Sequence, residues 1–369
     1  MVNGIKIENF KCFGDERKIE FSHFNILYGK NGRGKSTIIQ SLLLLAQNKD
    51  SISTLALKGS YVDLGNYKDV VNRYKTANSL KFSISSTIEE ELKMSFSSSV
   101  NGPTLLALDD LQVGDQRLFS SMGTAEDNTT GPNVSYATSD IKTLELLRGL
   151  RYVSANRRGP VNYEERQDEF FIGKDDIGVN GERVINGLLK QNDVFINNFS
   201  EALSFILDGA TVKVIGEEDS NNIELLLDSR DSSEGFKPTN IGYGYSYVLP
   251  IIYQFLKAEK NGIVIAENPE AHLYPAAQSR LIEWMVRIAS EKNLQVILET
   301  HSDHIINGLR IAIKKKQLDR QDVFILFVDR DKPQDSPEIR HILIDQNGTL
   351  SENPSEFMDE WTNQMIDLL

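Results

Sequence analysis

The first hundred residues alternate hydrophobic and polar positions in short runs, which is typical of strands that bury one face. Residues 5–13 predict a strand, and residues 16–21 look like its hairpin partner. Further alternating runs at 61–64, 80–84 and 92–96 are separated by Gly, Asn and Ser. This part of the chain is therefore predicted to form an antiparallel sheet.

The second half of the chain has longer apolar periods, which predict helices and buried strands. Residues 184–207 have helical apolar spacing, and residues 211–215 with 223–227 predict a hairpin. From residue 248 onward helix and strand patterns alternate, as in a parallel α/β layer. Residues 120–140 are polar and contain turn-forming residues, so we expect a loop there.

Composition narrows the class of protein. With 369 residues and 40% hydrophobic content, the chain can bury a core as one large or two smaller domains. The net charge is −13 and the pI about 5.0, so DNA contact would need a local patch or a partner. A single cysteine, Cys12, excludes internal disulfides and a cysteine-rich zinc site. The sequence shows no apolar run of the ~18 residues that a membrane span needs and no signal peptide, so we expect a cytoplasmic protein without a membrane partner.

Residues 29–36, GKNGRGKS, match the phosphate-binding pattern G-x-x-x-x-G-K-[ST] without a mismatch. An apolar run at 24–28 precedes the match, and residues 37–43 predict a helix after it. In such a loop the glycines let backbone N–H groups face a phosphate chain. Lys35 would reach the β- and γ-phosphates, and the Ser36 hydroxyl would ligate Mg²⁺. The residues predicted to bind a nucleoside triphosphate are Gly29, Asn31, Gly32, Gly34, Lys35, Ser36 and Thr37.

A second constellation begins where an apolar run at 262–266 ends in the acidic sequence ENPEAHLYP, residues 267–275. P-loop enzymes place the carboxylate linked to Mg²⁺ and the residue that activates water at such a strand end. This string resembles the D-E-P-E-x-H-L-H-P Walker B and D-loop segment of RecF-, SMC- and OLD-like AAA family ATPases, the ABC-type heads.

Two further motifs extend the resemblance. Residues 240–246 resemble the signature loop of that family, which contacts ATP bound to the other subunit, and Gly242, Gly244 and Ser246 are its candidate ligands. Residues 299–304, ETHSDH, resemble the switch-histidine loop, in which His301 would sense the γ-phosphate. The four motifs occur in family order at both ends of the chain, and the resemblance is weaker between them.

The acidic motif departs from the family pattern at one position. Aligned on the following Pro-Glu, Glu267 replaces the usual Mg²⁺-side aspartate and Asn268 replaces the catalytic glutamate. An asparagine orients water but cannot accept its proton. With the register shifted by one residue, Glu267 is itself the catalytic carboxylate, and Glu270 is a further candidate base. We expect slow hydrolysis, with Glu267, Asn268, Glu270 and His301 as the candidate catalytic residues and Ser36 and Glu267 as the metal ligands.

Three other features have competing interpretations. Arg157 and Arg158 follow a short apolar run and either couple to the nucleotide or a partner, or are surface charge. Asp329 and Asp331 follow a predicted strand, but an isolated carboxylate pair is a weak indication of a nuclease centre. The amphipathic residues 357–369 predict a final helix, which either packs on the body or docks a partner.

Together these patterns predict an α/β P-loop NTPase of the ABC-type head class, with an antiparallel β subdomain and an inserted helical lobe. We expect an N-terminal lobe at 1–150, an insertion lobe at 151–235 and a C-terminal lobe at 236–369. The resemblance implies a homodimer that sandwiches ATP and Mg²⁺. It also implies a partner effector, for example a nuclease encoded by a neighbouring gene, in bacterial anti-phage defence or DNA maintenance. The alternative is a RecF-like ATP-dependent DNA-binding repair ATPase.

Overall fold

The computed structural model describes residues 1–50, 52–99, 102–121, 141–167, 175–216, 221–228, 235–354 and 360–368. They form two compact units. Unit 1 contains residues 1–150 and 324–342, and unit 2 contains residues 151–323 and 343–369. Most of the predicted loop at 120–140 lies outside the described residues.

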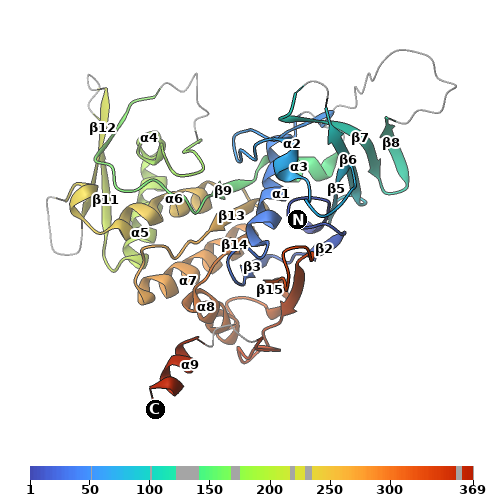
Figure 1. The fold of residues 1–369 in the computed structure, drawn as a ribbon. Helices are drawn as coiled ribbons and strands as arrows, with labels where there is room; N and C mark the ends of the chain where they lie inside the picture. Colours follow the sequence, from blue (N-terminus) through green and yellow to red (C-terminus); the bar gives the residue numbers. More distant parts are fainter. Residues whose placement is uncertain are drawn as a thin grey trace. The chain divides into compact units, whose positions relative to one another are not determined.

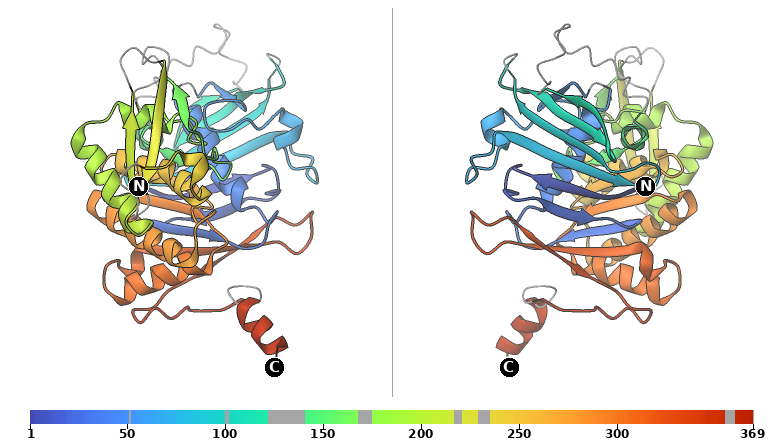
Figure 2. Two further views of the ribbon diagram at one scale, coloured as in Figure 1. Left: turned by 90° about the vertical axis from the view of Figure 1, so that its left-hand side faces the viewer. Right: turned by 90° about the vertical axis from the view of Figure 1, so that its right-hand side faces the viewer.

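Unit 1 is built on a seven-stranded antiparallel sheet in the order β2-β1-β5-β6-β7-β4, with β8 paired to β7. Figure 2 shows strands β5 to β8 side by side in this layer. Its strands are β1 (Val2–Glu8), β2 (Arg17–Glu20), β4 (Thr54–Ala56), β5 (Ser79–Ser86), β6 (Leu92–Ser98), β7 (Leu105–Val113) and β8 (Gln116–Ser120). The predicted antiparallel sheet and its N-terminal hairpin are confirmed.

Alternation sets which face of this sheet is buried. In β5 the apolar positions Leu80, Phe82 and Ile84 are buried and the intervening residues are not. The run at 61–64, by contrast, is a turn rather than a strand. There the Gly59 N–H donates to the Val62 carbonyl at 3.0 Å, so local turn bonds replace a strand ladder.

Unit 1 also contains the short strand β3 (Phe24–Tyr28) and the helix α1 (Lys35–Gln47) that the phosphate-loop match predicted. Strand β3 neighbours β15 (Val323–Asp329), and β15 pairs antiparallel with β16 (Glu338–Ile342). Leucines and isoleucines lie all around α1 and are buried, as expected of a core helix. The remaining helices of this unit are α2 (Tyr67–Val70) and α3 (Lys142–Arg148).

Unit 2 contains the predicted parallel layer, in which β13 (Ile263–Glu267) pairs with both β9 (Arg151–Val153) and β14 (Gln295–Glu299). Continuous burial along β13 and β14 is typical of parallel strands covered on both faces. The helices that alternate with these strands are α6 (Tyr243–Lys257), α7 (Pro275–Lys292) and α8 (Asp303–Lys314). Helices α7 and α8 lie side by side (Figure 1).

A smaller antiparallel sheet in unit 2 has the order β10-β12-β11, from β10 (Tyr163–Glu165), β11 (Thr211–Ile215) and β12 (Asn222–Asp228). The helical spacing predicted over 184–207 is confirmed, and the segment is divided into two helices, α4 (Val184–Leu189) and α5 (Asp193–Ile206). Asn192 starts the second helix, since its side chain accepts a hydrogen bond from the Phe195 N–H at 2.9 Å.

The chain ends in α9 (Glu360–Asp367), which confirms the predicted final helix. Its side chains Met365 and Ile366 are 43% and 62% exposed. The side chain of Trp361, through which this helix could dock a partner, lies outside the described part. Two 3-10 turns complete unit 2, η2 (Pro238–Asn240) and η3 (Arg320–Asp322). Within the ranges that the structure describes, no helix is both long enough and apolar enough to span a membrane.

Candidate nucleotide site

The loop between β3 and α1 takes its shape from its glycines. Gly29, Gly32 and Gly34 have φ angles of 136°, 73° and 119°, a region that side-chain-bearing residues rarely adopt. Gly34 is the N-cap of α1, no side chain caps this end, and the first turn contains no acidic residue. The helix therefore begins with its positive end directed at the loop, which favours an anion such as a phosphate.

Lys35 is held within this loop. Its side chain is 3% exposed, and Nζ donates to the carbonyls of Gly29 at 2.7 Å and Lys30 at 2.8 Å. A buried ammonium needs such oxygen partners, because isolated burial of a charge is strongly unfavourable. A phosphate chain supplies equivalent anionic oxygens, so Lys35 is already placed in a site that suits them.

Two other segments of unit 1 pack closely against the loop. A Cβ atom on Gly29 would lie 2.3 Å from the Val328 carbonyl oxygen. On Gly34 it would lie 2.9 Å from Pro337 and 3.0 Å from the Cys12 sulfur. The thiol also lies 3.5 Å from the Thr37 hydroxyl, and burial raises the pKa of Cys12, so it stays protonated as a donor. Gly29 and Gly34 are thus required by packing as well as by their backbone conformation.

In unit 2 the ends of the parallel strands carry carboxylates. Glu267 ends β13 and is in register with Glu299, which ends β14. The Glu267 carboxylate accepts hydrogen bonds from the Ala155 N–H at 3.3 Å and from the Tyr152 hydroxyl. Burial nevertheless raises the pKa of Glu267 above its ordinary value, since desolvation outweighs these bonds and the nearby charge of Arg157. Glu267 is therefore a buried, oriented carboxylate of the kind found at functional sites.

Asn268 and Glu270 form the turn that follows β13. Asn268 has a φ of 44°, and its N–H donates to the Glu299 carbonyl at 2.7 Å. Glu270 accepts the His301 N–H at 3.0 Å through Oε1, which joins this turn to the predicted switch loop. Asn268 Oδ1 and Glu270 Oε2 are buried and have no hydrogen-bond partner in the described structure. Two such acceptors in one turn are suited to a water molecule, a cation or a ligand.

Arg157 supports this turn through hydrogen bonds to its backbone. The sequence alone left the role of this arginine undecided. Its side chain is 3% exposed, and it donates to the carbonyls of Ser154, Glu267 and Asn268. Its guanidinium also lies 5.4 Å from the ring centre of Tyr247. The neighbouring Arg158 is exposed and donates to the Glu182 carbonyl. The paired arginines therefore divide into one buried in the site and one on the surface.

The predicted signature loop is the start of α6. Gly242 is the N-cap, and a Cβ atom on Gly244 would lie 2.7 Å from the His272 carbonyl oxygen, so a glycine is required there too. Tyr243 is 57% exposed and lies 5.6 Å from His272, ring centre to ring centre. Ser246 is only 8% exposed, and its hydroxyl is buried without a hydrogen-bond partner in the residues described. The outward-facing groups of this loop are therefore Gly242 and Tyr243 rather than the Ser246 hydroxyl.

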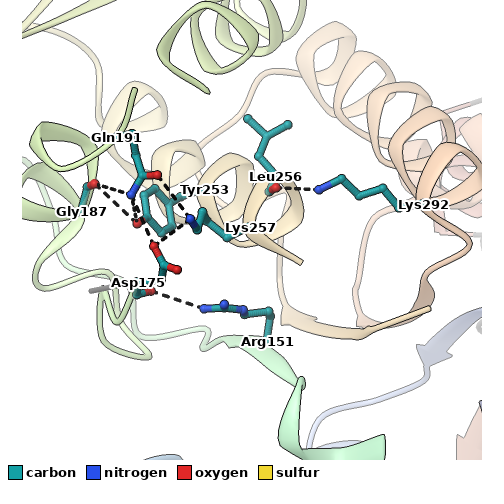
Figure 3. A network of polar contacts seen from close by, with 8 residues as sticks. All are labelled: Arg151, Asp175, Gly187, Gln191, Tyr253, Leu256, Lys257 and Lys292. Atoms are coloured by element: carbon teal, nitrogen blue, oxygen red, sulfur yellow. Dashed lines mark hydrogen bonds and ion pairs between the residues drawn. The ribbon is translucent and has the colours of Figure 1, made fainter. Parts of the chain in front are cut away.

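Helix α6 is fixed at its other end by a polar network (Figure 3). Lys292 Nζ donates to the carbonyls of Phe255, Leu256 and Ala258, which lie at the end of the helix. A cation at the C-terminal end of a helix also interacts favourably with the helix dipole. In the same network Lys257 pairs with Asp175 at 2.7 Å. This anchoring fixes the helix whose first turn presents Gly242 and Gly244.

The switch loop is held by side chains on both sides of it. Ser302 caps α8 by accepting the N–H groups of His304 and Ile305, and its hydroxyl donates to Gln278 Oε1 at 2.6 Å. Gln278 in turn donates to the Leu273 carbonyl at 2.7 Å. His301 itself is exposed. The loop, the D-loop segment and the turn after β13 are therefore joined within unit 2.

Comparison with protein families identifies the chain. A family model described as "AAA domain, putative AbiEii toxin, Type IV TA system" matches residues 24–307. The chain belongs to this AAA family. A second model, described as "Protein of unknown function (DUF3696)", matches residues 318–368. None of the curated proteins compared with this AAA family member matches it in sequence.

Solved structures of SMC head domains share the fold of this AAA family member. An SMC head bound to the C-winged helix domain of ScpA is 15% identical, with a TM-score of 0.55 over 94% of this chain and 98% of that one. The head from Pyrococcus furiosus, bound to the C-terminal domain of ScpA, gives 13% identity and 0.54 over 100% and 99%. The head from Thermotoga maritima gives 12% and 0.50 over 93% and 99%. The predicted SMC- and RecF-like recognition and the P-loop, ABC-type head fold are confirmed, and the family supports ATP binding.

Each unit of this AAA family member offers oxygen atoms of the kind that Mg²⁺ prefers. Unit 1 has the Ser36 hydroxyl. Unit 2 has the Glu267 carboxylate, together with Asn268 Oδ1 and Glu270 Oε2, two acceptors without a partner in the described structure. No cluster of three or more His, Cys, Asp or Glu side chains placed for a metal occurs in the described ranges.

Proposed function

We propose that the chain is an ATP-gated switch: it binds Mg·ATP, two copies close around two nucleotides, and the closed state controls a partner protein. The observation that carries this proposal is the loop at residues 29–36, with its three glycines at positive φ, its uncapped helix start and its buried Lys35. These features create an anion site from backbone and one ammonium. The match to an AAA family supports ATP as the anion.

In this proposal the residues of unit 1 hold the phosphates. The loop N–H groups and Lys35 bind the β- and γ-phosphates, and Asn31 and Thr37 line the same loop. The Ser36 hydroxyl and the Glu267 carboxylate hold Mg²⁺, which neutralises phosphate charge when bound. When the nucleotide binds, Lys35 exchanges the carbonyl oxygens of Gly29 and Lys30 for phosphate oxygens. The positive charge that the phosphates need is therefore already in place in the loop.

The second copy acts through the start of its α6. Gly242 and Gly244 present backbone N–H groups at a helix N-terminus, and Tyr243 is exposed beside them. Contact between these groups and a γ-phosphate held by the other copy exists only in the closed dimer. A ligand shifts a conformational equilibrium only by its differential affinity for the two states, so this contact is what makes ATP drive closure.

Hydrolysis is proposed to be slow. Asn268 occupies the position expected for the catalytic glutamate, and an amide cannot take a proton from water. Glu267 and Glu270 are the two carboxylates able to do so. His301 joins this set because its N–H binds Glu270, so that a change in the switch loop reaches a candidate base. A slow step of this kind prolongs the closed state.

The partner is proposed to be an effector such as a nuclease, in anti-phage defence or DNA maintenance. The SMC heads that share the fold were solved with domains of the partner ScpA, which is a precedent for a head that binds another protein. The chain's net charge of −13 disfavours direct attraction to DNA and favours action through a partner.

The test is the native mass of the purified chain without nucleotide and with Mg·ATP, measured by light scattering. We expect a monomer that becomes a dimer with ATP. Lys35→Ala should stay monomeric, and Glu267→Gln should dimerise and persist because it retains the ATP. Lys58→Ala, in an exposed ion pair with Asp63, is the control and should behave as wild type. A mass that ATP leaves unchanged in the wild-type chain would refute the switch.

A further inference from the structure

The segment from Val328, near the end of β15, to Pro337, just before β16, packs against the phosphate-binding loop. This segment comes from the part of the chain matched by the second family model, residues 318–368, and not from the AAA match. Its approach is closest at two glycines, where Gly29 meets the Val328 carbonyl and Gly34 meets Pro337. The C-terminal family segment is therefore part of the environment of the loop.

Two arginines join the loop and this segment reciprocally. Arg33 donates from Nη1 to the Arg330 carbonyl, and its Nε lies 3.4 Å from the Asp329 carboxylate. In the opposite direction, Arg330 Nη2 donates to the Gly32 carbonyl at 3.1 Å. We call Arg33, Asp329, Arg330 and the Gly32 carbonyl the arginine clasp. The clasp contacts two consecutive loop residues, Gly32 and Arg33. A Cβ atom on Gly32 would have no atom within 4 Å.

The far side of the same segment is tied to the turn between β1 and β2. Ser336 Oγ accepts the N–H groups of Gly14 at 3.0 Å and Asp15 at 2.9 Å, and Ser336 is 7% exposed. Arg17 Nε donates to the Pro337 carbonyl at 3.2 Å. The segment is thus fixed to the sheet on one side and to the phosphate-binding loop on the other. The clasp therefore holds the loop in a fixed position relative to the sheet.

We propose that Asp329 and Arg330 are positioning residues that set the affinity for nucleotide by holding the phosphate-binding loop in its binding conformation. A loop with three glycines loses much conformational freedom when it orders, and pre-ordering it removes this loss from the binding step. Gly32 needs such support most, because it has no side chain and a Cβ atom at this position would have no atom within 4 Å. The proposal rests on the proposed function, since it assumes that the loop binds ATP.

The clasp is suited to this role because it lies at the surface of the site and not in the core. Arg33 and Asp329 are 29% and 40% exposed at their side chains, and Asp329 and Arg330 line an open polar groove. Water can therefore replace the clasp bonds when a residue is changed, so that the fold persists. What changes is the freedom of the loop before nucleotide arrives.

The test compares Asp329→Asn and Arg330→Ala with wild type in the full chain, with titration calorimetry for ADP and steady-state kinetics for ATP. We expect the Kd and KM to rise about tenfold each, the factor that 1.4 kcal/mol represents, with kcat unchanged. The melting temperature without nucleotide should stay close to wild type. Arg340→Ala, in the same groove but packed on Phe327, is the matched control and should leave the Kd unchanged.

A double variant separates positioning from an unrelated effect. If Asp329 acts through Arg33, Arg33→Ala with Asp329→Asn should bind no more weakly than Arg33→Ala alone. Asp329→Glu should restore most of the affinity. Full additivity, an unchanged Kd in both single variants, or a loss of kcat without a change in KM would each overturn the proposal. Failure of the wild-type chain itself to bind nucleotide would instead refute the proposed function.

Discussion

Replacing Arg157 by Met is the substitution for which the structure gives the sharpest expectation. Met keeps much of the volume but removes the charge and all of the hydrogen bonds. Arg157 donates to the carbonyls of Ser154, Glu267 and Asn268, at 3.1, 2.8 and 2.5 Å. Two of these carbonyls belong to the strand end and turn that carry the candidate catalytic groups. The variant should therefore affect both stability and catalysis.

The size of the effect follows from two opposing terms. Hydrogen bonds to a charged group contribute about 1.5–3 kcal/mol each, so three give roughly 4.5–9 kcal/mol. Burial lowers the pKa of Arg157 from its ordinary value to about 10, which at 1.36 kcal/mol per pH unit means that keeping the charge costs about 3 kcal/mol. The net loss in Arg157→Met is then roughly 1.5–6 kcal/mol, a large part of a typical stability of about 5–15 kcal/mol.

Urea denaturation followed by tryptophan fluorescence measures the first consequence, and ATP turnover measured well below the unfolding midpoint measures the second. We expect a lower midpoint with an unchanged slope, and turnover reduced at least tenfold in the folded variant. Arg158→Met is the matched control, because that neighbouring arginine is exposed and makes one carbonyl contact. It should change the free energy of unfolding by less than about 0.5 kcal/mol. Equal effects at the two positions would refute the assignment of Arg157 to the site.

Three further expectations follow. Burial raises the pKa of Glu267 above 4.5, so the folded state binds more protons than the unfolded state above that pH and stability falls as the pH rises through the raised pKa. Glu267→Gln should therefore gain stability relative to wild type as the pH is raised above 4.5, and a difference independent of pH would contradict this. Gly29→Ala should destabilise unit 1 by at least about 1–3 kcal/mol through its strained φ alone, and the clash of the new Cβ with the Val328 carbonyl adds to this loss. Gly32→Ala should lower the stability by only about 1–2 kcal/mol, because a Cβ atom there has no atom within 4 Å. Lys292→Met, which removes three bonds to carbonyls at the end of α6, should lower the thermal midpoint by an amount equivalent to about 2 kcal/mol, and an unchanged melting curve would show that water replaces the ammonium.

Periodicity predicted the elements of this chain well wherever burial alone decides them. The alternation of Leu80, Phe82 and Ile84 places β5 correctly, because one face of the sheet is buried. The prediction fails at 61–64, where local bonds override the pattern: a turn that begins at Gly59 uses backbone groups that a strand would need. At 184–207 the helical spacing holds, and the Asn192 cap divides the segment into two helices.

The candidate site was predictable to the extent that its chemistry lies in short motifs. Lys35 and Glu267 were predicted as site residues because a loop motif and a strand end mark them locally in the sequence. Arg157 was not distinguished from Arg158, because its role depends on carbonyls 110 and 111 residues away in the sequence. The bond from His301 to Glu270 is equally invisible in the sequence, since it spans 31 residues that include α7 and β14. Pairing of distant segments is set by the fold, and a motif carries no record of it.

Several buried polar groups of unit 2 that have no hydrogen-bond partner in the described structure lie around the turn after β13, and they lower the stability of unit 2 there. Arg157 Nε, Ser246 Oγ, Asn268 Oδ1 and Glu270 Oε2 are all buried without a hydrogen-bond partner in the described structure, and all belong to the turn after β13 or to segments that contact it or carry the signature loop. Each buried polar group without a partner costs about 1–3 kcal/mol. The stability of the fold alone therefore gives no reason to keep such groups. Such groups are retained where a ligand, an ion or water completes them. Mg·ATP and the attacking water are oxygen-rich partners of the required kind, so the same atoms that weaken the turn when it is alone should stabilise it when nucleotide binds. Binding of Mg·ATP should accordingly protect the amides of residues 267–272 from hydrogen exchange more strongly than those of β11 and β12. Equal protection across unit 2 would show that these groups have no part in binding.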